Sequence, residues 1–317
     1  MKPLTILTVS YGHRTLLQEN IRLAQSLHAN FRHLVDWHVA ENSPADHPDR
    51  CVGNEIGFIV RQGDGETGKG ISHHHATALN KLLRTTKLNR HVLILDPDFF
   101  LLFPNWAEAI PEYMLSQKIS FFGVPWHPRH HENYRYFPAV HCFAFDSQVI
   151  DPASLDFTPV LEVLAWKRTR IAKLLNLIPA IGYRLTRRCW DTGTRIWFRY
   201  RDHSAKHEIV MPVYCPEPIY QTIKNRLIES LLPDRMCMEP QQPGYFSTET
   251  FRDRGWLNEQ IPDEWESFVW QDIPFGLHVR RSFAHHRRSD ANELTVLPTI
   301  LKSLRQTIEQ QATRAHK

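Results

Sequence analysis

The sequence predicts an α/β fold with a mostly parallel central sheet flanked by helices, and three observations support this. Apolar runs of strand length alternate with longer amphipathic segments from Leu4 onward. Several of these runs are nearly continuous, which is typical of strands covered on both faces. The chain has 317 residues, enough to bury the core of such a domain. In folds of this kind, ligands bind at the carboxyl ends of the strands.

The elements appear in order along the first half of the chain. Turn-forming residues follow the first two strand-like runs, Tyr11-Gly12 after the first and Asn42-Ser43-Pro44 after the second. A glycine-bearing loop that ends at Gly70 precedes the second amphipathic segment. The expected strands are residues 4–10, 35–40, 56–61 and 91–95, and the expected helices are residues 16–27 and 72–83.

The second half of the chain lacks this alternation. After Asp151, prolines and aromatic residues interrupt the pattern, and residues 167–188 contain lysines and arginines but no acidic residue. The tail over residues 293–313 carries leucine and isoleucine at alternating spacings of three and four, which predicts a helix with one apolar face. We expect this helix to pack on its own domain, with a dimer seam as the alternative.

Composition limits the cellular setting and the kinds of partner. The five cysteines are scattered and form no close pair, which favours a reducing, cytoplasmic location. The longest apolar stretch, residues 174–183, is too short to span a bilayer, so any membrane contact is expected to be peripheral. A net charge of +4 suits a phosphate-bearing ligand better than a long nucleic-acid footprint, and no nucleic-acid partner is expected.

Asp96 and Asp98 flank Pro97 directly after the fourth expected strand. Residues two apart at a strand end can direct their side chains to the same side, and the proline stops the strand from continuing. Mg²⁺ and Mn²⁺ bind oxygen ligands, commonly one or two protein carboxylates completed by water and phosphate. The two aspartates are therefore candidate ligands for Mn²⁺ or Mg²⁺.

Together, four features of the first half resemble family 2 glycosyltransferases of the GT-A fold. They are the opening strand and helix, Glu41-Asn42-Ser43, the stretch from Gly70 to Asn80, and Leu95-Asp96-Pro97-Asp98. The resemblance implies a nucleoside-diphosphate sugar donor, a glycan or lipid-linked acceptor, and an enzyme that inverts the anomeric centre. It also implies a role in polysaccharide biosynthesis. The implied donor-binding residues are Thr8, Ser10, Tyr11, Asn42, Gly70 and Asp96.

Two later positions resemble further parts of the family pattern. Asp191, in Trp190-Asp191-Thr192-Gly193, matches the carboxylate that acts as base toward the acceptor hydroxyl, and its alternative role is to cap the next helix. His278 matches the late histidine that completes the metal shell in many GT-A enzymes, and its alternative is a surface histidine in a basic loop. The resemblance thus implies Asp96, Asp98 and His278 as metal ligands and Asp191 as the catalytic base.

The 19 histidines invite other readings. His73, His74 and His75 are consecutive on an expected helix, so they point about 100° apart and cannot all bind one ion; we expect them to be solvated or packed. His203 and His207 would lie one helical turn apart, which leaves a zinc-dependent hydrolase as an alternative. A non-catalytic module that binds through the basic segment 167–188 is the other alternative.

We expect a single GT-A-like domain over residues 1–317. Residues 1–150 would bind the nucleotide sugar and the metal, residues 151–292 would form the acceptor side, and residues 293–317 would form the C-terminal helix.

Overall fold

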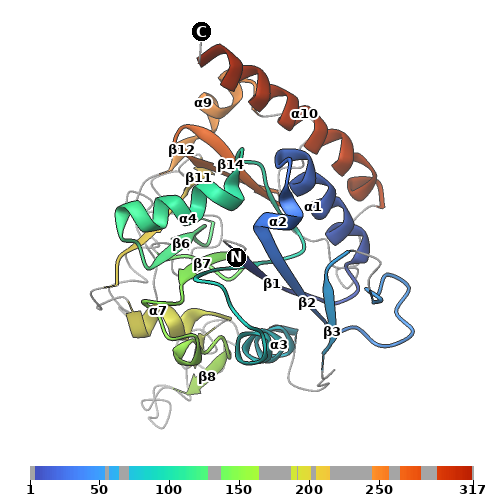
Figure 1. Ribbon diagram of the computed structural model, residues 1–317, viewed down its shortest axis with the longest axis vertical. Helices are drawn as coiled ribbons and strands as arrows, with labels where there is room; N and C mark the ends of the chain where they lie inside the picture. The colour runs from blue at the N-terminus through green and yellow to red at the C-terminus, as the bar shows by residue number, and fades with distance from the viewer. Residues whose placement is uncertain are drawn as a thin grey trace, which may run out of the picture.

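The structure is a computed structural model that describes residues 4–53, 57–63, 71–127, 137–163, 187–190, 192–200, 205–214, 245–256, 265–279 and 291–315. It contains two larger sheets and a separate two-stranded ribbon, with helices packed against the sheets (Figure 1). The helices are α1 (Arg14–Leu27), α2 (Phe31–Leu34), α3 (Ile71–Thr85), α4 (Trp106–Gln117), α7 (Thr194–Tyr200), α9 (Thr248–Asp253) and α10 (Ala291–Ala315), with a 3₁₀ turn, η2, at Pro152–Ser154.

The first sheet has seven strands in the order β10-β6-β7-β4-β1-β2-β3. β4, β1, β2 and β3 run parallel, β10 runs parallel to β6, and only β7 is antiparallel to its neighbours. The predicted class, a mostly parallel sheet flanked by helices, is therefore confirmed. The strands are β1 (Leu4–Ser10), β2 (Val35–Glu41), β3 (Ile59–Gln62), β4 (His91–Leu95), β6 (Phe121–Gly123), β7 (Cys142–Asp146) and β10 (His207–Ile209).

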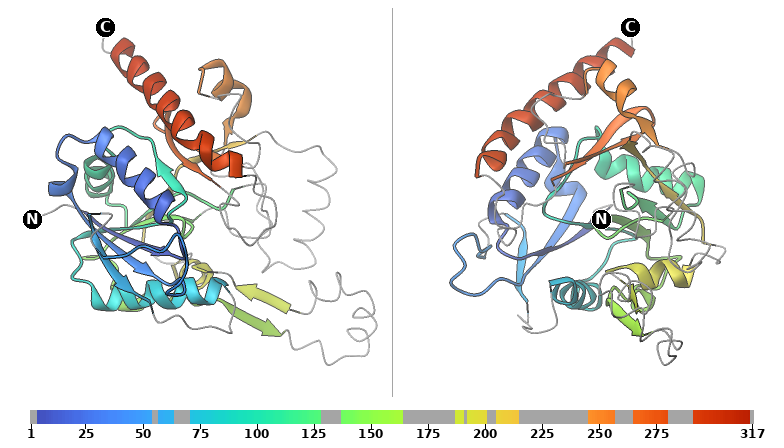
Figure 2. Two further views of the ribbon diagram at one scale, coloured as in Figure 1. Left: turned by 90° about the vertical axis from the view of Figure 1, so that its right-hand side faces the viewer. Right: turned by 180° about the vertical axis from the view of Figure 1, so that it is seen from behind.

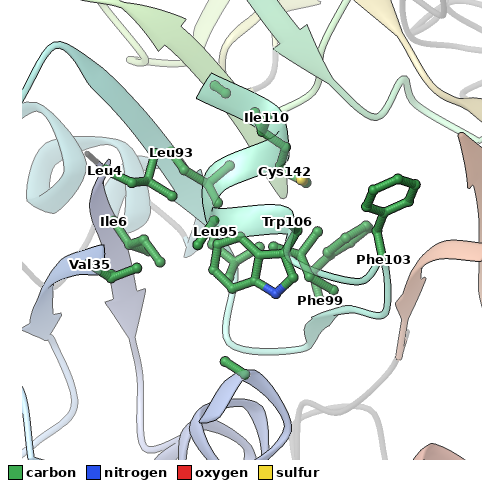
Figure 3. Close-up of a cluster of buried hydrophobic side chains, with 14 of the residues drawn as sticks. Leu4, Ile6, Val35, Leu93, Leu95, Phe99, Phe103, Trp106, Ile110 and Cys142 are labelled. Atoms are coloured by element: carbon green, nitrogen blue, oxygen red, sulfur yellow. The ribbon is translucent and has the colours of Figure 1, made fainter. Parts of the chain in front are cut away.

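Alternation along β1 and β4 assigns their side chains to two cores. Leu4 and Ile6 face α1, α2 and α4, in a cluster that includes Trp106 and Phe99 (Figure 3). Leu7 and Val9 face the opposite way, toward α3 and α7. Because both faces of these strands are covered, each strand is buried along its whole length, as expected for central strands of such a sheet.

A second sheet of five strands, in the order β12-β11-β13-β14-β5, was not foreseen from the sequence. β5 pairs antiparallel with β14, β14 with β13, and β13 with β11, so chain segments far apart in sequence meet here. The second half is thus more regular, over its described parts, than its composition suggested. The strands are β5 (Phe99–Leu101), β11 (Met211–Tyr214), β12 (Phe246–Ser247), β13 (Glu266–Trp270) and β14 (Ile273–His278).

The C-terminal helix α10 packs on its own chain, as predicted. Its apolar face contacts Leu16 and Leu23 of α1 and Phe100 of β5, and it lies along α1 (Figures 1 and 2). The buried side chains of this face are Leu297, Ile300, Leu301, Leu304 and Ile308. Burying such a stripe stabilises the helix mainly through removal of apolar surface from water.

The two-stranded ribbon joins β8 (Val160–Val163) to β9 (Arg187–Trp190) in antiparallel pairing and extends away from the two larger sheets (Figure 2). Most of the basic segment 167–188 lies outside the described residues. Within the part of the chain that is described, no helix combines the length and the apolar character needed to cross a membrane.

Candidate active site

The turn Asp96-Pro97-Asp98 connects the two sheets, because β4 ends at Leu95 and β5 begins at Phe99. The Asp96 backbone N–H donates to the His141 carbonyl at 3.0 Å, and the Asp96 carbonyl accepts from the Phe99 N–H at 3.1 Å. The turn lies at the carboxyl end of β4, beside the carboxyl end of β1. This is the edge at which parallel α/β sheets bind ligands.

Side chains and backbone from distant segments hold the turn in place. The buried Asn20 of α1 donates its Nδ2 to the Phe99 carbonyl at 2.8 Å and to the Pro97 carbonyl at 3.4 Å. The Val279 N–H, just after β14, donates to the Asp98 carbonyl at 2.8 Å. A buried amide that is satisfied in this way fixes the backbone from which both aspartates project.

Asp98, His278 and Glu266 form a buried row. His278 Nε2 lies 3.7 Å from Asp98 Oδ1, and His278 Nδ1 lies 2.9 Å from Glu266 Oε2. Side-chain exposure is 9% for Asp98, 8% for His278 and 1% for Glu266. Burial would lower the pKa of His278, but hydrogen bonds to Asp98 and Glu266 and their negative charges outweigh it and raise the pKa to about 10.

The structure therefore places His278 beside Asp98, as the resemblance implied, and rejects the alternative of a surface histidine. His141 stacks on the His278 ring with centroids 4.6 Å apart and planes 7° apart. Nothing in the sequence pattern pointed to Glu266. The available signal was a carboxylate at the first residue of a mainly apolar strand.

Asp96 has a different neighbour. Its Oδ1 lies 3.3 Å from Nε2 of His75 on α3, and both side chains are about one-fifth exposed, at 21% and 20%. The consecutive histidines thus separate as their helical spacing requires, because His73 instead contacts Thr77 on its own helix at 3.4 Å. The sequence predicted solvated or packed histidines here, and the structure places one of them, His75, against Asp96.

His13, at the start of α1, is a further buried imidazole near the aspartates. Its Nδ1 accepts from the Tyr11 N–H at 3.1 Å. Burial lowers its pKa, and the nearby charges of Asp98, Glu41 and Asp96 oppose that shift only in part. His13 therefore lies in the same negatively charged surroundings as the aspartate turn. No spacing pattern in the sequence pointed to His13.

The hydroxyl groups of Thr8 and Ser10, near the end of β1, form hydrogen bonds within the protein. Thr8 Oγ1 donates to the Leu95 carbonyl at 2.8 Å and accepts from Trp37 Nε1 at 2.9 Å, while Ser10 Oγ donates to Glu41 at 2.8 Å. Both side chains are buried. Direct contact with a donor, as the resemblance implied for Thr8 and Ser10, would require them to leave these partners.

Glu41 ties the loops around β1 and β2 together. Its buried carboxylate accepts from the Ser10 hydroxyl and from three backbone N–H groups, those of Gly12, Ser43 and Cys51, at 2.8–3.2 Å. Burial would raise the pKa of Glu41, but the bonds from Cys51, Ser43 and Ser10 lower it. An ionised carboxylate at this point fixes the segment that carries Tyr11 and the segment that carries Asn42.

Tyr11 and Asn42 lie at the same strand-end edge. Tyr11 is half-buried, with its ring 6.2 Å from that of His47. Asn42 donates its Nδ2 to the His74 carbonyl at 3.2 Å, and its Oδ1 has no hydrogen-bond partner among the described residues. A Cβ added to Gly63 would lie 1.5 Å from that oxygen, so only glycine fits here beside Asn42.

Two predicted site residues, Gly70 and Asp191, lie outside the described residues. Their immediate neighbours are described. Ile71 begins α3, and the Thr192 hydroxyl donates to the Ser72 carbonyl at 3.3 Å. The turn that follows Asp191 therefore contacts the first turn of the helix that carries His75.

The chemistry of these side chains fits a divalent cation, although no group of three or more histidine, cysteine, aspartate or glutamate side chains is arranged to hold a metal among the described residues. A cation bonded to two atoms at about 2.1 Å each can bridge atoms up to about 4.2 Å apart. The 3.7 Å between Asp98 and His278 satisfies this limit. Glu266 on the other imidazole nitrogen matches the carboxylate partner typical of ligating histidines.

The alternative of a zinc-dependent hydrolase rested on two histidines one helical turn apart, and the structure does not support that spacing. His207 is the first residue of strand β10, where its ring contacts that of Phe137 at 5.3 Å, so the expected helical spacing from His203 does not apply. His203 itself and most of the basic segment of the binding-module alternative lie outside the described residues.

No protein-family model matches the sequence, and no curated protein matches it. Among solved structures, the chain is similar to the mannosyltransferase PcManGT from Pyrobaculum calidifontis in complex with GDP-Man and Mn²⁺, at 16% identity and a TM-score of 0.35. That match covers 49% of this chain and 47% of the mannosyltransferase.

Two further solved structures are similar to this chain. TarS 1-349 from S. aureus in complex with UDP-GlcNAc is 12% identical, with a TM-score of 0.36 over 50% of this chain and 48% of its own. Glucosyl-3-phosphoglycerate synthase from Mycobacterium tuberculosis, in complex with Mn²⁺, UDP and glucosyl-3-phosphoglycerate, is 13% identical, with a TM-score of 0.37 over 75% and 81%. The chain thus spans about half the length of the first two proteins and about four-fifths of the third.

Proposed function

We propose that this chain is a glycosyltransferase that moves a sugar from a nucleoside-diphosphate donor to a glycan or lipid-linked acceptor, with Mn²⁺ or Mg²⁺ as cofactor. The observation that carries the proposal is the approach of His278 to Asp98, 3.7 Å apart, at the carboxyl end of β4. A carboxylate and an imidazole from different sheets converge at the edge where such folds bind ligands, and Glu266 orients the imidazole.

On the donor side, we assign Tyr11 and Asn42 to contact with the nucleotide, supported by their place beside the end of β1. Thr8 and Ser10 shape this strand end through their internal hydrogen bonds. Gly70 precedes α3, where a residue without a side chain would let the donor approach the helix. Asp96 adds a partly exposed carboxylate on the metal side of the same sheet edge.

Asp98 and His278, together with Asp96, would hold the cation against the donor diphosphate. When bound, such a cation supplies positive charge that stabilises the departing nucleoside diphosphate. Asn20 and the Val279 N–H keep the aspartate turn fixed, so the ligating atoms need little rearrangement. Preorganised groups of this kind lower the cost of reaching the transition state.

On the acceptor side, we assign Asp191 as the base. The acceptor oxygen would form a bond to the anomeric carbon while the bond from that carbon to the diphosphate oxygen breaks, and the acceptor proton would pass to the Asp191 carboxylate. A single displacement of this kind inverts the anomeric centre. The contact of Thr192 with Ser72 supports the assignment, because it connects the Asp191 turn to the helix that reaches Asp96.

We also assign residues 1–150 to donor binding and residues 151–292 to the acceptor side of one domain over residues 1–317, with one refinement. Glu266 and His278 come from the second region yet serve the metal. Polysaccharide biosynthesis, a cytoplasmic location and peripheral membrane contact complete the proposal. Support for them comes from the family resemblance, from Cys51 and Cys142, which are buried free thiols, and from the basic character of residues 167–188.

The test is thermal unfolding with UDP or GDP, in Mn²⁺, in Mg²⁺ and in excess chelator. Ligands that bind the native state raise its apparent stability. We expect one nucleotide to raise Tm with a cation and to have little effect with chelator. Equal stabilisation in chelator would remove the cation from the donor site, and no stabilisation by any nucleotide would contradict the proposed function.

A further inference from the structure

His75 is a histidine on α3 whose side chain meets the partly exposed aspartate of the turn. Its Nε2 lies 3.3 Å from Asp96 Oδ1, within reach of an N–H donated to the carboxylate. The other aspartate, Asp98, has its own histidine in His278. Each carboxylate beside Pro97 therefore has an imidazole partner, and the two imidazoles come from different parts of the chain.

The first turns of α3 are anchored on two sides. Asn42 donates to the His74 carbonyl at 3.2 Å, and Thr192 donates to the Ser72 carbonyl at 3.3 Å. One residue further along, Ala76 is fully buried in the core beneath the helix. His75 thus projects from a backbone that is fixed relative to β2 and to the turn after Asp191, so its imidazole has few positions available.

Asp96 depends more than Asp98 on a neighbouring side chain to hold its carboxylate in one orientation. Asp98 is almost fully buried and is restrained by its surroundings, whereas Asp96 is about one-fifth exposed. A partly exposed carboxylate loses rotational freedom when it binds a cation, and a neighbouring donor that already fixes its rotamer reduces that loss. A carboxylate has two acceptor oxygens, so contact of one with His75 is compatible with cation binding at the other.

We propose that His75 is a positioning residue that orients Asp96 for cation and donor binding. This inference rests on the proposed function, since it concerns the same site. His73 provides the matched comparison, because it lies on the same anchored helix and its Nδ1 contacts Thr77 instead of the aspartate turn. Partners that orient metal-ligating side chains typically contribute about 10–100-fold to metal affinity.

The experiment measures Mn²⁺ affinity by calorimetry, in the presence of the nucleotide that stabilises the wild type, for wild type, His75→Ala, His75→Gln and His73→Ala. We expect His75→Ala to weaken Mn²⁺ binding about 10–100-fold. His75→Gln should recover much of the loss, because its amide can donate to the carboxylate. His73→Ala should match the wild type, and the metal-free Tm of all four proteins should agree closely.

Each of the other possible outcomes would contradict either the role of His75 or the proposed function. Wild-type affinity in His75→Ala would overturn the role of His75 while leaving the proposed function intact. Equal losses in His75→Ala and His73→Ala, or a matching fall in the metal-free Tm, would show that the helix and not the imidazole is responsible. Absence of Mn²⁺ binding by the wild type with every nucleotide tested would overturn both the inference and the proposed function.

Discussion

The two aspartates beside Pro97 have the same chemical partner in different surroundings. Asp98 and His278 are buried, and Glu266 occupies the second nitrogen of the imidazole. Asp96 and His75 lie at the surface of the same site, each about one-fifth exposed. Burial strengthens interactions between charges and raises the cost of breaking them, while exposure to solvent weakens a pair.

This difference separates two tasks that the Asp-Pro-Asp spacing alone would combine. The buried row joins the first sheet to the second, so it contributes to the fold as well as to the site. The partly exposed pair contributes little to the fold. The same motif therefore contains one carboxylate with a structural role and one without.

The largest expected effect comes from Asp98→Ala compared with Asp96→Ala. Removing Asp98 leaves His278 and Glu266 buried with an incomplete set of partners, which should cost about 3–5 kcal/mol of unfolding free energy. Removing Asp96 should cost about 1 kcal/mol or less, because its pair is partly exposed. Urea unfolding without metal measures both changes. Equal destabilisation would show that the two pairs do not differ in this way.

The same two variants should also differ in binding. Asp98→Ala should lose the cation-dependent stabilisation by nucleotide, whereas Asp96→Ala should weaken it and retain part of it. Nucleotide titrations in Mn²⁺ check this. Full retention in Asp98→Ala would exclude Asp98 as a ligand whatever its effect on stability.

The next prediction tests whether Asp191, and not a carboxylate of either pair, removes the acceptor proton. We expect Asp191→Asn to keep the wild-type donor affinity and to lower the transfer rate about 10²–10⁴-fold, since a base acts in the chemical step. Two measurements separate donor affinity from transfer rate. Nucleotide titration reports the affinity, and release of nucleotide from the donor with and without acceptor reports the rate. A wild-type rate in Asp191→Asn would make this residue a helix cap and would move the base elsewhere.

The smallest effect is a pH dependence confined to the buried row. An unperturbed histidine would titrate near about 6.5, but the pKa of His278 is raised to about 10, so the imidazole is protonated at neutral pH without metal. Cation binding at Nε2 must displace that proton. Mn²⁺ affinity should therefore rise up to about tenfold per pH unit from pH 7 to 9. A His278→Ala protein with the same slope would exclude His278 as a ligand.

The metal-free protein should show the opposite trend in stability. A pKa raised on folding stabilises the native state fully below pH 6.5, the ordinary value, and this contribution is lost as the pH rises through about 10. Unfolding free energies of wild type and His278→Gln should therefore converge toward alkaline pH. A constant difference across this range would show that His278 does not carry the charge assigned to it.

Much of the first sheet could be predicted because its signals are local. The run from His91 to Leu95 is apolar throughout and ends at Asp96, and the structure gives β4 those same bounds. Leu4 to Ser10 was likewise predicted as a strand and is β1. Continuous apolar runs of this length between turn residues leave few alternatives.

The rest of the site depends on pairing between distant segments, which a single sequence does not specify. Glu266 reaches His278 because β13 and β14 pair antiparallel, and His278 reaches Asp98 because β14 pairs with β5. His278 could be named only through the family resemblance, and Glu266 not at all. His75 could be placed on a helix, but the direction in which it points depends on how α3 packs against β1 and β2.

The pairing of β5 with β14 also has a consequence for synthesis of the chain. A ribosome releases the N-terminus first, so β1, β2 and β4 emerge long before β14. Asp96 and Asp98 are then already present, but the imidazole of His278 and the strand that brings it to β5 are not. The buried row can therefore form only late in translation. A nascent or truncated chain that ends before residue 278 would have the aspartates exposed at the end of β4 and no means of completing the buried row.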